Sequence, residues 1–132
     1  MLCRTCRLPT AAVHHLDHGA KPKLGNAEAL SVERRKIEEL RACTQSDKVS
    51  GLLTELQPGA NRTDVGDAIA VLFDLFGQER LMWGSDWPIL THVGEHLRWF
   101  EPVQHEFAGI CSHALNSEMG ENALRIYRRR LR

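Results

Sequence analysis

Two side chains capable of acid–base chemistry follow short apolar runs, and the first of them is Asp86. It lies in the segment 83–88, Trp-Gly-Ser-Asp-Trp-Pro, directly after a short apolar run. A carboxylate that is partly shielded from water by neighbouring tryptophan rings can take a proton from an attacking water molecule. The alternative interpretation is an Asx turn, in which Asp86 only shapes the chain before Trp87 and Pro88. The local sequence therefore presents Asp86 as a candidate general base and leaves the structural role open.

His18 is the second candidate, in the segment 17–22, Asp-His-Gly-Ala-Lys-Pro. An imidazole at this position can bind a divalent ion or polarise a substrate carbonyl, and Asp17 could orient it. The alternative is an exposed loop histidine. Lys21 either neutralises a substrate carboxylate or forms an ordinary surface ion pair. The segment thus offers a candidate ligand for a metal or carbonyl group and a candidate substrate contact.

Ser50 lies in a second short run with apolar residues, two positions after Lys48. If this run forms a strand parallel to the one before it, Ser50 reaches the same end of the sheet as His18. Ser50 is therefore also a candidate substrate contact.

The chain has four cysteines, too few and too scattered for a secreted disulfide scaffold. They are Cys3, Cys6, Cys43 and Cys111. We expect thiols with mostly structural roles. A structural zinc site at Cys3 and Cys6, with His14 and His15 downstream, is a further hypothesis, although the spacing fits no common zinc finger. His14 and His15 are otherwise expected to be structural residues of a strand.

Strand and helix patterns alternate along the chain and indicate the elements that position these residues. The predicted strands cover residues 11–16, 48–55 and 80–84. The predicted helices cover residues 26–43, 63–76 and most of 94–132, with a break at Pro102 and a last short helix over 121–130. Parallel βα units place functional residues in the loops that follow the strands, and both His18 and Asp86 fall in such loops.

The first two predicted helices each have an apolar face. On the first helix, this face is expected to hold Val32, Ile37, Leu40 and Cys43. On the second helix, it is expected to hold Val65, Ala68, Ile69, Leu72, Leu75 and Phe76. Thr63 or Asp64 is expected to cap the start of the second helix, and Gly77 is expected to end it.

The composition disfavours several classes of protein. A chain of 132 residues with 42% apolar and 26% charged residues is typical of one modest globular domain. Lys and Arg balance Asp and Glu at 17 each, so no nucleic-acid partner is expected. There is no apolar run of membrane-spanning length, and residues 1–7 lack the apolar core of a signal peptide. We therefore expect no membrane partner and a cytoplasmic location.

Four segments resemble the motifs of a known family, in the order in which that family carries them. They are residues 16–22, 48–55, 80–88 and 122–127. Over residues 8–132 the chain is similar to the C-terminal part of the amidohydrolase-related family, within the superfamily of metal-dependent hydrolases. It resembles most the branch of sugar lactonases and 2-pyrone-4,6-dicarboxylate lactonases. Residues 1–7 do not match.

The resemblance implies an α/β fold made of the last three βα units of a TIM (β/α)8 barrel, with C-terminal helices. It also implies hydrolysis of a lactone or related cyclic ester, with Asp86 as the base that activates water. The implied ligands of a metal or carbonyl group are His18 and Asp86. The implied contacts of a small lactone or carboxylate substrate are Lys21, Ser50 and Trp87. One divalent ion, zinc or a similar metal, is the implied cofactor, although some relatives need none.

The chain departs from the family in its length. A complete barrel needs roughly 250 residues, and the family's first-strand His-x-His pair is absent. Three strands cannot close an eight-stranded barrel, so we expect a fragment that needs an oligomer or a complementing chain. Two hypotheses stay open: a lactonase-like hydrolase whose fragment is inactive alone, and a non-catalytic barrel remnant or interaction module.

Overall fold

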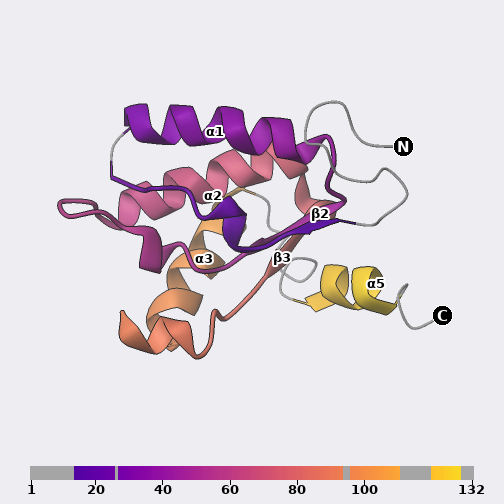
Figure 1. Cartoon of the computed structure of the whole chain (residues 1–132). Coiled ribbons are helices and arrows are strands. Elements are labelled where there is room, and N and C mark those ends of the chain that lie inside the picture. The colour runs from indigo at the N-terminus through magenta and orange to yellow at the C-terminus, as the bar shows by residue number, and fades with distance from the viewer. Residues whose placement is uncertain (1–13, 26, 94–95, 111–119, 129–132) are drawn as a thin grey trace.

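Three short parallel strands form one sheet at the centre of the structure (Figure 1). The computed structural model describes residues 14–25, 27–93, 96–110 and 120–128. The strands are β1 (His15–Leu16), β2 (Ser46–Val49) and β3 (Leu81–Trp83), in the order β1-β2-β3. Both pairs are parallel, and Asp47 lies opposite Leu16 on one side and Leu81 on the other. The predicted succession of parallel βα units is therefore confirmed, while residues 11–13 of the first predicted strand lie outside the described ranges.

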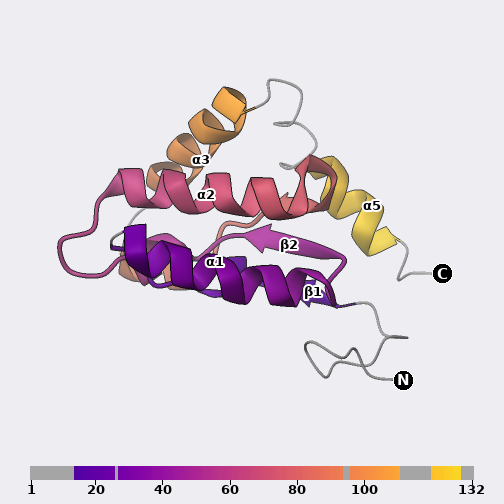
Figure 2. The same cartoon turned by 90° about the horizontal axis from the view of Figure 1, so that it is seen from above.

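Two helices cover one side of this sheet. α1 (Ala27–Arg41) connects β1 to β2, and α2 (Arg62–Phe76) connects β2 to β3. The two views agree that α1 and α2 lie side by side on the same side of the strands (Figure 1, Figure 2). Parallel neighbours require crossovers of this kind. In the described part of the chain, the helices are too short or too polar to cross a membrane.

The buried face of α1 differs from the predicted one. Ile37 is buried and Leu30 packs against the core, whereas Val32 is 49% exposed. With 3.6 residues per turn, Leu30 returns to nearly the same face as Ile37, while Val32 points well away from it. The prediction that Val32 faces the core is therefore wrong. Leu40 and Cys43, which were also placed on this face, are half-buried.

α2 has well-defined ends. Asn61 is the N-cap residue, because its side-chain oxygen accepts a hydrogen bond from the Thr63 amide at 2.7 Å. Asp64 completes a capping box by accepting from the Asn61 amide at 2.7 Å. The predicted cap at Thr63 or Asp64 is therefore wrong, whereas the predicted end at Gly77 is confirmed. The predicted core residues of this helix are all buried: Val65, Ala68, Ile69, Leu72, Leu75 and Phe76.

β2 begins earlier and ends earlier than predicted. It ends at Val49, and residues 53–55 form a short 3-10 helix instead of continuing the strand. Gly51 has a φ of +65°, which an extended strand does not allow, and the Thr54 hydroxyl donates to the Gly51 carbonyl at 2.6 Å. The chain therefore turns directly after Ser50, which places Ser50 at the end of the strand rather than within it.

α3 (His96–Ile110) continues through Pro102, where a break was predicted. A proline inside a helix removes one backbone hydrogen bond and is usually destabilising. Here Trp99, Val103 and Phe107, each four residues apart, are at most 1% exposed and belong to the same apolar core as α2. Packing of this face therefore maintains the helix despite the lost bond.

The last described helix, α5 (Asn122–Arg128), falls within the predicted range 121–130. Asn122 is 4% exposed, and its side-chain amide donates to the carbonyl oxygens of Gln78 at 2.6 Å and Leu81 at 2.8 Å. These bonds attach α5 to the start of β3. Figure 1 shows α5 below the strands and α1 above them.

Cys43, just past the end of α1, is disulfide-bonded. The prediction of a free thiol is therefore wrong at this position. Cys3, Cys6 and Cys111 lie outside the described residues, and so does the hypothesised zinc site at Cys3 and Cys6.

Candidate active site

The ends of the three strands bring three polar side chains together. His18 follows β1, Ser50 follows β2 directly, and Asp86 lies three residues past β3. His18 Nδ1 is 2.7 Å from Ser50 Oγ and 3.4 Å from Asp86 Oδ1. The carboxyl ends of neighbouring parallel strands meet at one edge of the sheet, which explains why residues so far apart in the sequence meet here. We call His18, Ser50 and Asp86 the His18 cluster.

The His18 cluster is buried unevenly. Ser50 is 0% exposed and the Asp86 side chain 7%, whereas the His18 side chain is 31% exposed. Asp86 Oδ2 is buried and has no hydrogen-bond partner among the described residues. A buried acceptor without a partner costs about 1–3 kcal/mol, and more when it is charged. This oxygen is therefore set up to accept a hydrogen bond from a molecule that enters the site.

Positive φ angles mark the two loops that carry His18 and Asp86. His18, Ala20 and Lys21 have φ angles of 59°, 63° and 52°, and with Gly19 they form a left-handed turn that contains the 3-10 element η1 (His18–Ala20). Asp86 has a φ of 58°. Non-glycine residues in this region cost of order 1–3 kcal/mol each, and such residues concentrate at functional sites. Here the strained backbone carries the two candidate catalytic residues themselves.

Two glycines leave the space that the His18 cluster occupies. A Cβ atom on Gly51 would lie 3.0 Å from His18 Nδ1, and one on Gly84 would lie 3.0 Å from Ser50 Cβ and 2.9 Å from Lys48 Cδ. Contacts this short require a neighbouring group to move. Glycine at both positions therefore lets the ring of His18 and the side chain of Ser50 approach the backbone closely.

α3 holds the loop that carries Asp86. The buried indole of Trp99 donates to the Gly84 carbonyl at 2.8 Å, and the Gly84 amide donates to the Val49 carbonyl at 3.0 Å. On the other side of Asp86, the Leu90 amide donates to the Asp86 carbonyl at 2.8 Å. Hydrogen bonds before and after Asp86 therefore fix the backbone from which its side chain extends.

Lys21 and Trp87 lie at the surface. Lys21 Nζ is 3.7 Å from Glu55 Oε1 and its side chain is 58% exposed. Trp87 is 75% exposed, so it does not shield Asp86 from water as the sequence suggested. Trp83 is half-buried and packs edge-on against Phe100, with ring centroids 5.6 Å apart. No hydrogen bond or ion pair among the described residues joins Lys21 or Trp87 to the His18 cluster.

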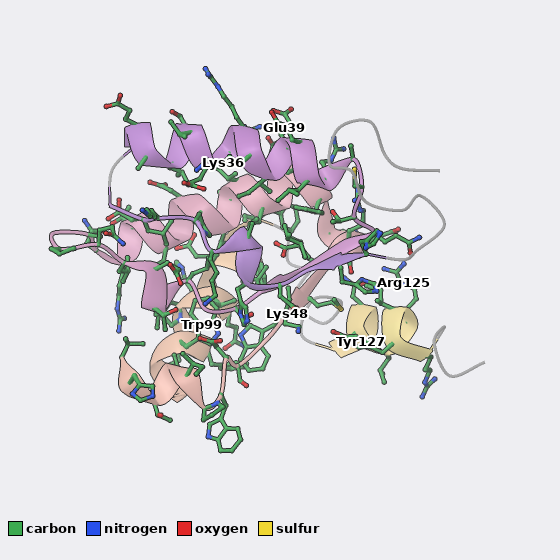
Figure 3. All side chains as sticks on the ribbon, in the orientation of Figure 1. Lys36, Glu39, Lys48, Trp99, Arg125 and Tyr127 are labelled. Atoms are coloured by element: carbon green, nitrogen blue, oxygen red, sulfur yellow. The ribbon has the colours of Figure 1, made fainter. Side chains whose placement is uncertain are left out.

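Asp17, which the sequence offered as a partner that could orient His18, pairs with Lys48 instead. Lys48 Nζ donates to Asp17 Oδ1 at 2.7 Å, and this bond raises the pKa of Lys48 above its ordinary value, against the opposing effect of partial burial. Tyr127 on α5 also raises the Lys48 pKa. Figure 3 shows Lys48 and Tyr127 on the side of the sheet away from α1. The Lys48 ammonium is therefore already paired with a carboxylate.

The His18 cluster offers two ligand types that zinc accepts, an imidazole and a carboxylate. Zinc sites generally use at least three protein ligands. The described part of the chain brings no three His, Cys, Asp or Glu side chains together in an arrangement that could hold a metal ion. These residues therefore do not complete a metal site. An ion bound by His18 and Asp86 would need further ligands from outside the described residues.

Asp47 is a buried acid that sequence reasoning missed. It is 0% exposed, and burial raises its pKa well above the usual range, although the nearby backbone amides of Lys48 and Gly19 oppose the shift. Neither carboxyl oxygen has a hydrogen-bond partner of standard geometry within the described residues. A polar stretch before an apolar run gave no signal of this burial, because only the pairing with strands on both sides encloses Asp47.

The chain belongs to the amidohydrolase family, whose sequence profile matches residues 15–129. It is 36% identical over 122 residues to an L-fucono-1,5-lactonase of Burkholderia ambifaria, covering 86% of this chain and 40% of that protein. An L-fucono-1,5-lactonase of Burkholderia multivorans is 37% identical over 84 residues, covering 56% of this chain and 28% of that protein. The resemblance to the amidohydrolase-related family, and to its lactonases, is therefore confirmed.

Solved structures show the same fold. A crystal structure of an amidohydrolase from Burkholderia multivorans with bound HEPES superimposes with a TM-score of 0.79 and 29% identity, covering 89% of this chain and 45% of that one. A second crystal structure of that amidohydrolase, with bound zinc, gives a TM-score of 0.79 and 30% identity, with 89% and 44% covered. The chain thus spans less than half the length of the relatives that it matches.

Proposed function

We propose that the chain is the C-terminal part of a TIM-barrel hydrolase that opens a lactone or a related cyclic ester. The relatives named L-fucono-1,5-lactonase support this reaction, and the parallel sheet with polar residues at its strand ends supports this fold. Because the chain spans less than half of these relatives, the proposal includes further βα units that close the barrel, supplied by a longer protein, an oligomer or a complementing chain.

The observation that carries the proposal is the environment of Asp86. Its Oδ2 atom is buried without a hydrogen-bond partner in the described part of the chain, and its Oδ1 atom lies 3.4 Å from the partly exposed His18. A carboxylate with one free acceptor atom at the edge of an accessible cluster can accept a proton from a bound water molecule. We therefore assign Asp86 the role of general base.

The proposed reaction adds one water molecule to the lactone. Asp86 takes a proton from water while the water oxygen bonds to the carbonyl carbon of the lactone. The tetrahedral intermediate then breaks the ring C–O bond, and Asp86 returns the proton to the ring oxygen that leaves. The product is an open-chain hydroxy acid, and Asp86 ends in its starting state.

The carbonyl oxygen gains negative charge in this reaction and needs a donor or a positive charge beside it. His18 is the most exposed member of the cluster and, as an imidazolium, can donate a hydrogen bond from Nε2. One structural relative contains bound zinc, so a divalent ion is part of the proposal. Since the described residues supply two ligands at most, no step above depends on the ion.

Lys21 and Trp87 are proposed contacts of a small lactone or carboxylate substrate, and Ser50, predicted as a third contact, is proposed to act through His18. Lys21 and Trp87 are exposed and lie within three residues of His18 and Asp86 along the chain, so both are accessible to a ligand at that edge of the sheet. Ser50 is fully buried and bonded to His18, so we expect it to act on the substrate through the imidazole.

The test is hydrolysis of L-fucono-1,5-lactone by the purified chain and by its Asp86→Asn variant. Loss of the base is expected to lower kcat by about 10²- to 10⁴-fold, with an unchanged thermal unfolding transition. The matched control is Asp74→Asn on α2, a carboxylate that is 64% exposed and should leave turnover intact. Equal and measurable turnover by wild type and Asp86→Asn, alone or beside a complementing chain, would rule out the assigned role.

A non-catalytic module that folds beside a partner half-barrel is the second candidate. The observation in its favour is that the described sheet has three strands and the chain covers less than half of each relative. Size-exclusion chromatography and circular dichroism of the chain alone test the dependence on a partner, and turnover beside a complementing chain separates the candidates. A monodisperse monomer that melts cooperatively would argue against dependence on a partner.

A further inference from the structure

Two oxygen atoms face the same nitrogen of His18. Ser50 Oγ lies 2.7 Å from His18 Nδ1, and Asp86 Oδ1 lies 3.4 Å from it. A Ser-His-Asp triad of the protease type would instead place its serine and its carboxylate on opposite ring nitrogens. Ser50 and Asp86 do not have that arrangement. Ser50 is therefore not placed as a nucleophile that His18 could activate while Asp86 orients the ring.

The nearby carboxylate decides which nitrogen carries the proton. If Nδ1 held a lone pair, that lone pair would face a carboxylate oxygen at 3.4 Å, and the two would repel. If Nδ1 carries hydrogen, the N–H dipole is attracted to Asp86 and can donate to Ser50 Oγ. The electrostatic environment thus favours the Nδ1–H tautomer of the neutral ring.

Ser50 is held rigidly enough to set the ring position. It is 0% exposed, and its Cβ atom packs against the backbone of Gly84. A Cβ atom added to Gly84 would lie only 3.0 Å from the Cβ atom of Ser50. The ring of His18 rests on Gly51, where a Cβ atom would lie 3.0 Å from Nδ1. These contacts therefore fix the carbon that carries the Ser50 hydroxyl and limit the movement of the His18 ring.

We infer that Ser50 is a positioning residue which, with Asp86, holds neutral His18 as the Nδ1–H tautomer and leaves a lone pair on Nε2. In this form Nε2 accepts a proton or binds a cation, and it does not donate to a substrate carbonyl. The consequence for lactone opening rests on the proposed function, whereas the tautomer itself does not. His18 was considered as a ligand for a divalent ion and as a group that polarises the substrate carbonyl. The neutral Nδ1–H ring can serve the first role, whereas the second requires the protonated ring.

Nitrogen NMR of the uniformly ¹⁵N-labelled chain tests this inference without turnover. Long-range ¹H–¹⁵N spectra are recorded about two pH units above the reference histidine pKa, and His18→Gln assigns the signals. The expected wild-type pattern has a protonated Nδ1 and an unprotonated Nε2. A dominant Nε2–H form in the wild type would overturn the inference.

Ser50→Ala removes the contact that holds Nδ1 toward Asp86, so the ratio of Nδ1–H to Nε2–H forms should fall about fivefold, equivalent to about 1 kcal/mol. The control is Ser31→Ala on α1, which deletes a hydroxyl bonded to the Glu28 carbonyl and should leave the ratio unchanged. If Ser50→Ala does not fold, Asp86→Asn supplies the second arm and should lower the same ratio. An unchanged ratio in folded Ser50→Ala would assign Ser50 no positioning role, and an unchanged ratio in Asp86→Asn would assign the carboxylate no part in selecting the tautomer.

The outcomes for the inference and for the proposed function can be distinguished. An Nδ1–H ring in a chain without lactonase activity, even beside a complementing chain, would support the role of Ser50 and refute the function. Lactonase activity with an Nε2–H ring would do the reverse.

Discussion

The two sides of the three-stranded sheet differ in what their side chains do. On the side covered by α1 and α2, Val49 and Leu81 are buried in a continuous apolar core. On the other side, β2 presents Lys48 and, at its end, Ser50, which bond to charged or titratable partners. Alternation along a single strand therefore separates the residues that stabilise the fold from those proposed to act on a substrate.

The difference shows where the fold accumulates unfavourable free energy. Apolar burial stabilises the helix side by about 25 cal/mol for each Å² removed from water. The end of the sheet that carries the His18 cluster has positive φ angles at His18 and Asp86 and a buried carboxylate oxygen without a partner within the described residues. The core on one side must therefore offset the strain at the site, with Asp47 as the exception within the helix side.

The largest expected effect on stability comes from opening a cavity on the helix side. Ile69→Ala removes a side chain that is 0% exposed, so we expect a loss of about 2–5 kcal/mol in the free energy of unfolding. Urea denaturation measures it, with Val32→Ala at a 49% exposed position as the control, expected within about 0.5 kcal/mol. A change in the His18 tautomer ratio in folded Ile69→Ala would show that the two sides are not separable.

Asp47 should make stability depend on pH. Because its folded pKa is raised, the folded state keeps a proton that the unfolded state has released at any pH between the ordinary aspartate pKa and the raised one. Its stabilising contribution is full below the ordinary aspartate pKa and is lost as pH rises through the folded pKa, by about 1.4 kcal/mol for each pH unit.

Asp47→Asn removes this ionisation, so the variant should gain stability relative to wild type as pH rises through that window. Urea denaturation at a series of pH values measures the difference, and Asp74→Asn is the control at an exposed carboxylate. Parallel stability curves for wild type and Asp47→Asn would contradict the assigned pKa.

The smallest effect is expected from the Asp17–Lys48 ion pair. The Asp17 side chain is 60% exposed, and ion pairs of this kind contribute about 0–1 kcal/mol. A double-mutant cycle with Lys48→Met and Asp17→Asn should therefore give a coupling energy below about 1 kcal/mol. A much larger coupling would mean that the polar side also stabilises the fold.

The spacing of apolar residues predicted those elements whose buried face depends only on neighbouring residues along the chain. The apolar residues of α2 and its end at Gly77 were readable from the sequence, because a helix repeats its buried face every few residues. The same spacing gave a wrong buried face for α1, where the apolar residues do not all lie on one side, and Val32 is exposed instead of buried. The spacing also failed at β2, where the left-handed conformation of Gly51 ends the strand.

The candidate site was predictable in part for a related reason. His18 and Asp86 follow apolar runs, and residues that follow parallel strands meet at one edge of the sheet. The contact between Ser50 and His18 Nδ1 could not be derived in this way, because it depends on the register of two strands and on the turn of η1. The surface positions of Lys21 and Trp87 also depend on how their loops fold.

The sequence by itself determined the family, the alternation of strands and helices, and the placement of His18 and Asp86 after strands. Tertiary structure alone decided the burial of Asp47, the pairing of Asp17 with Lys48, and the approach of Ser50 to the imidazole. The physical reason is the range of the interactions involved. Periodicity and turn chemistry act over a few neighbouring residues, whereas burial and hydrogen bonding in the His18 cluster join segments more than thirty residues apart along the chain.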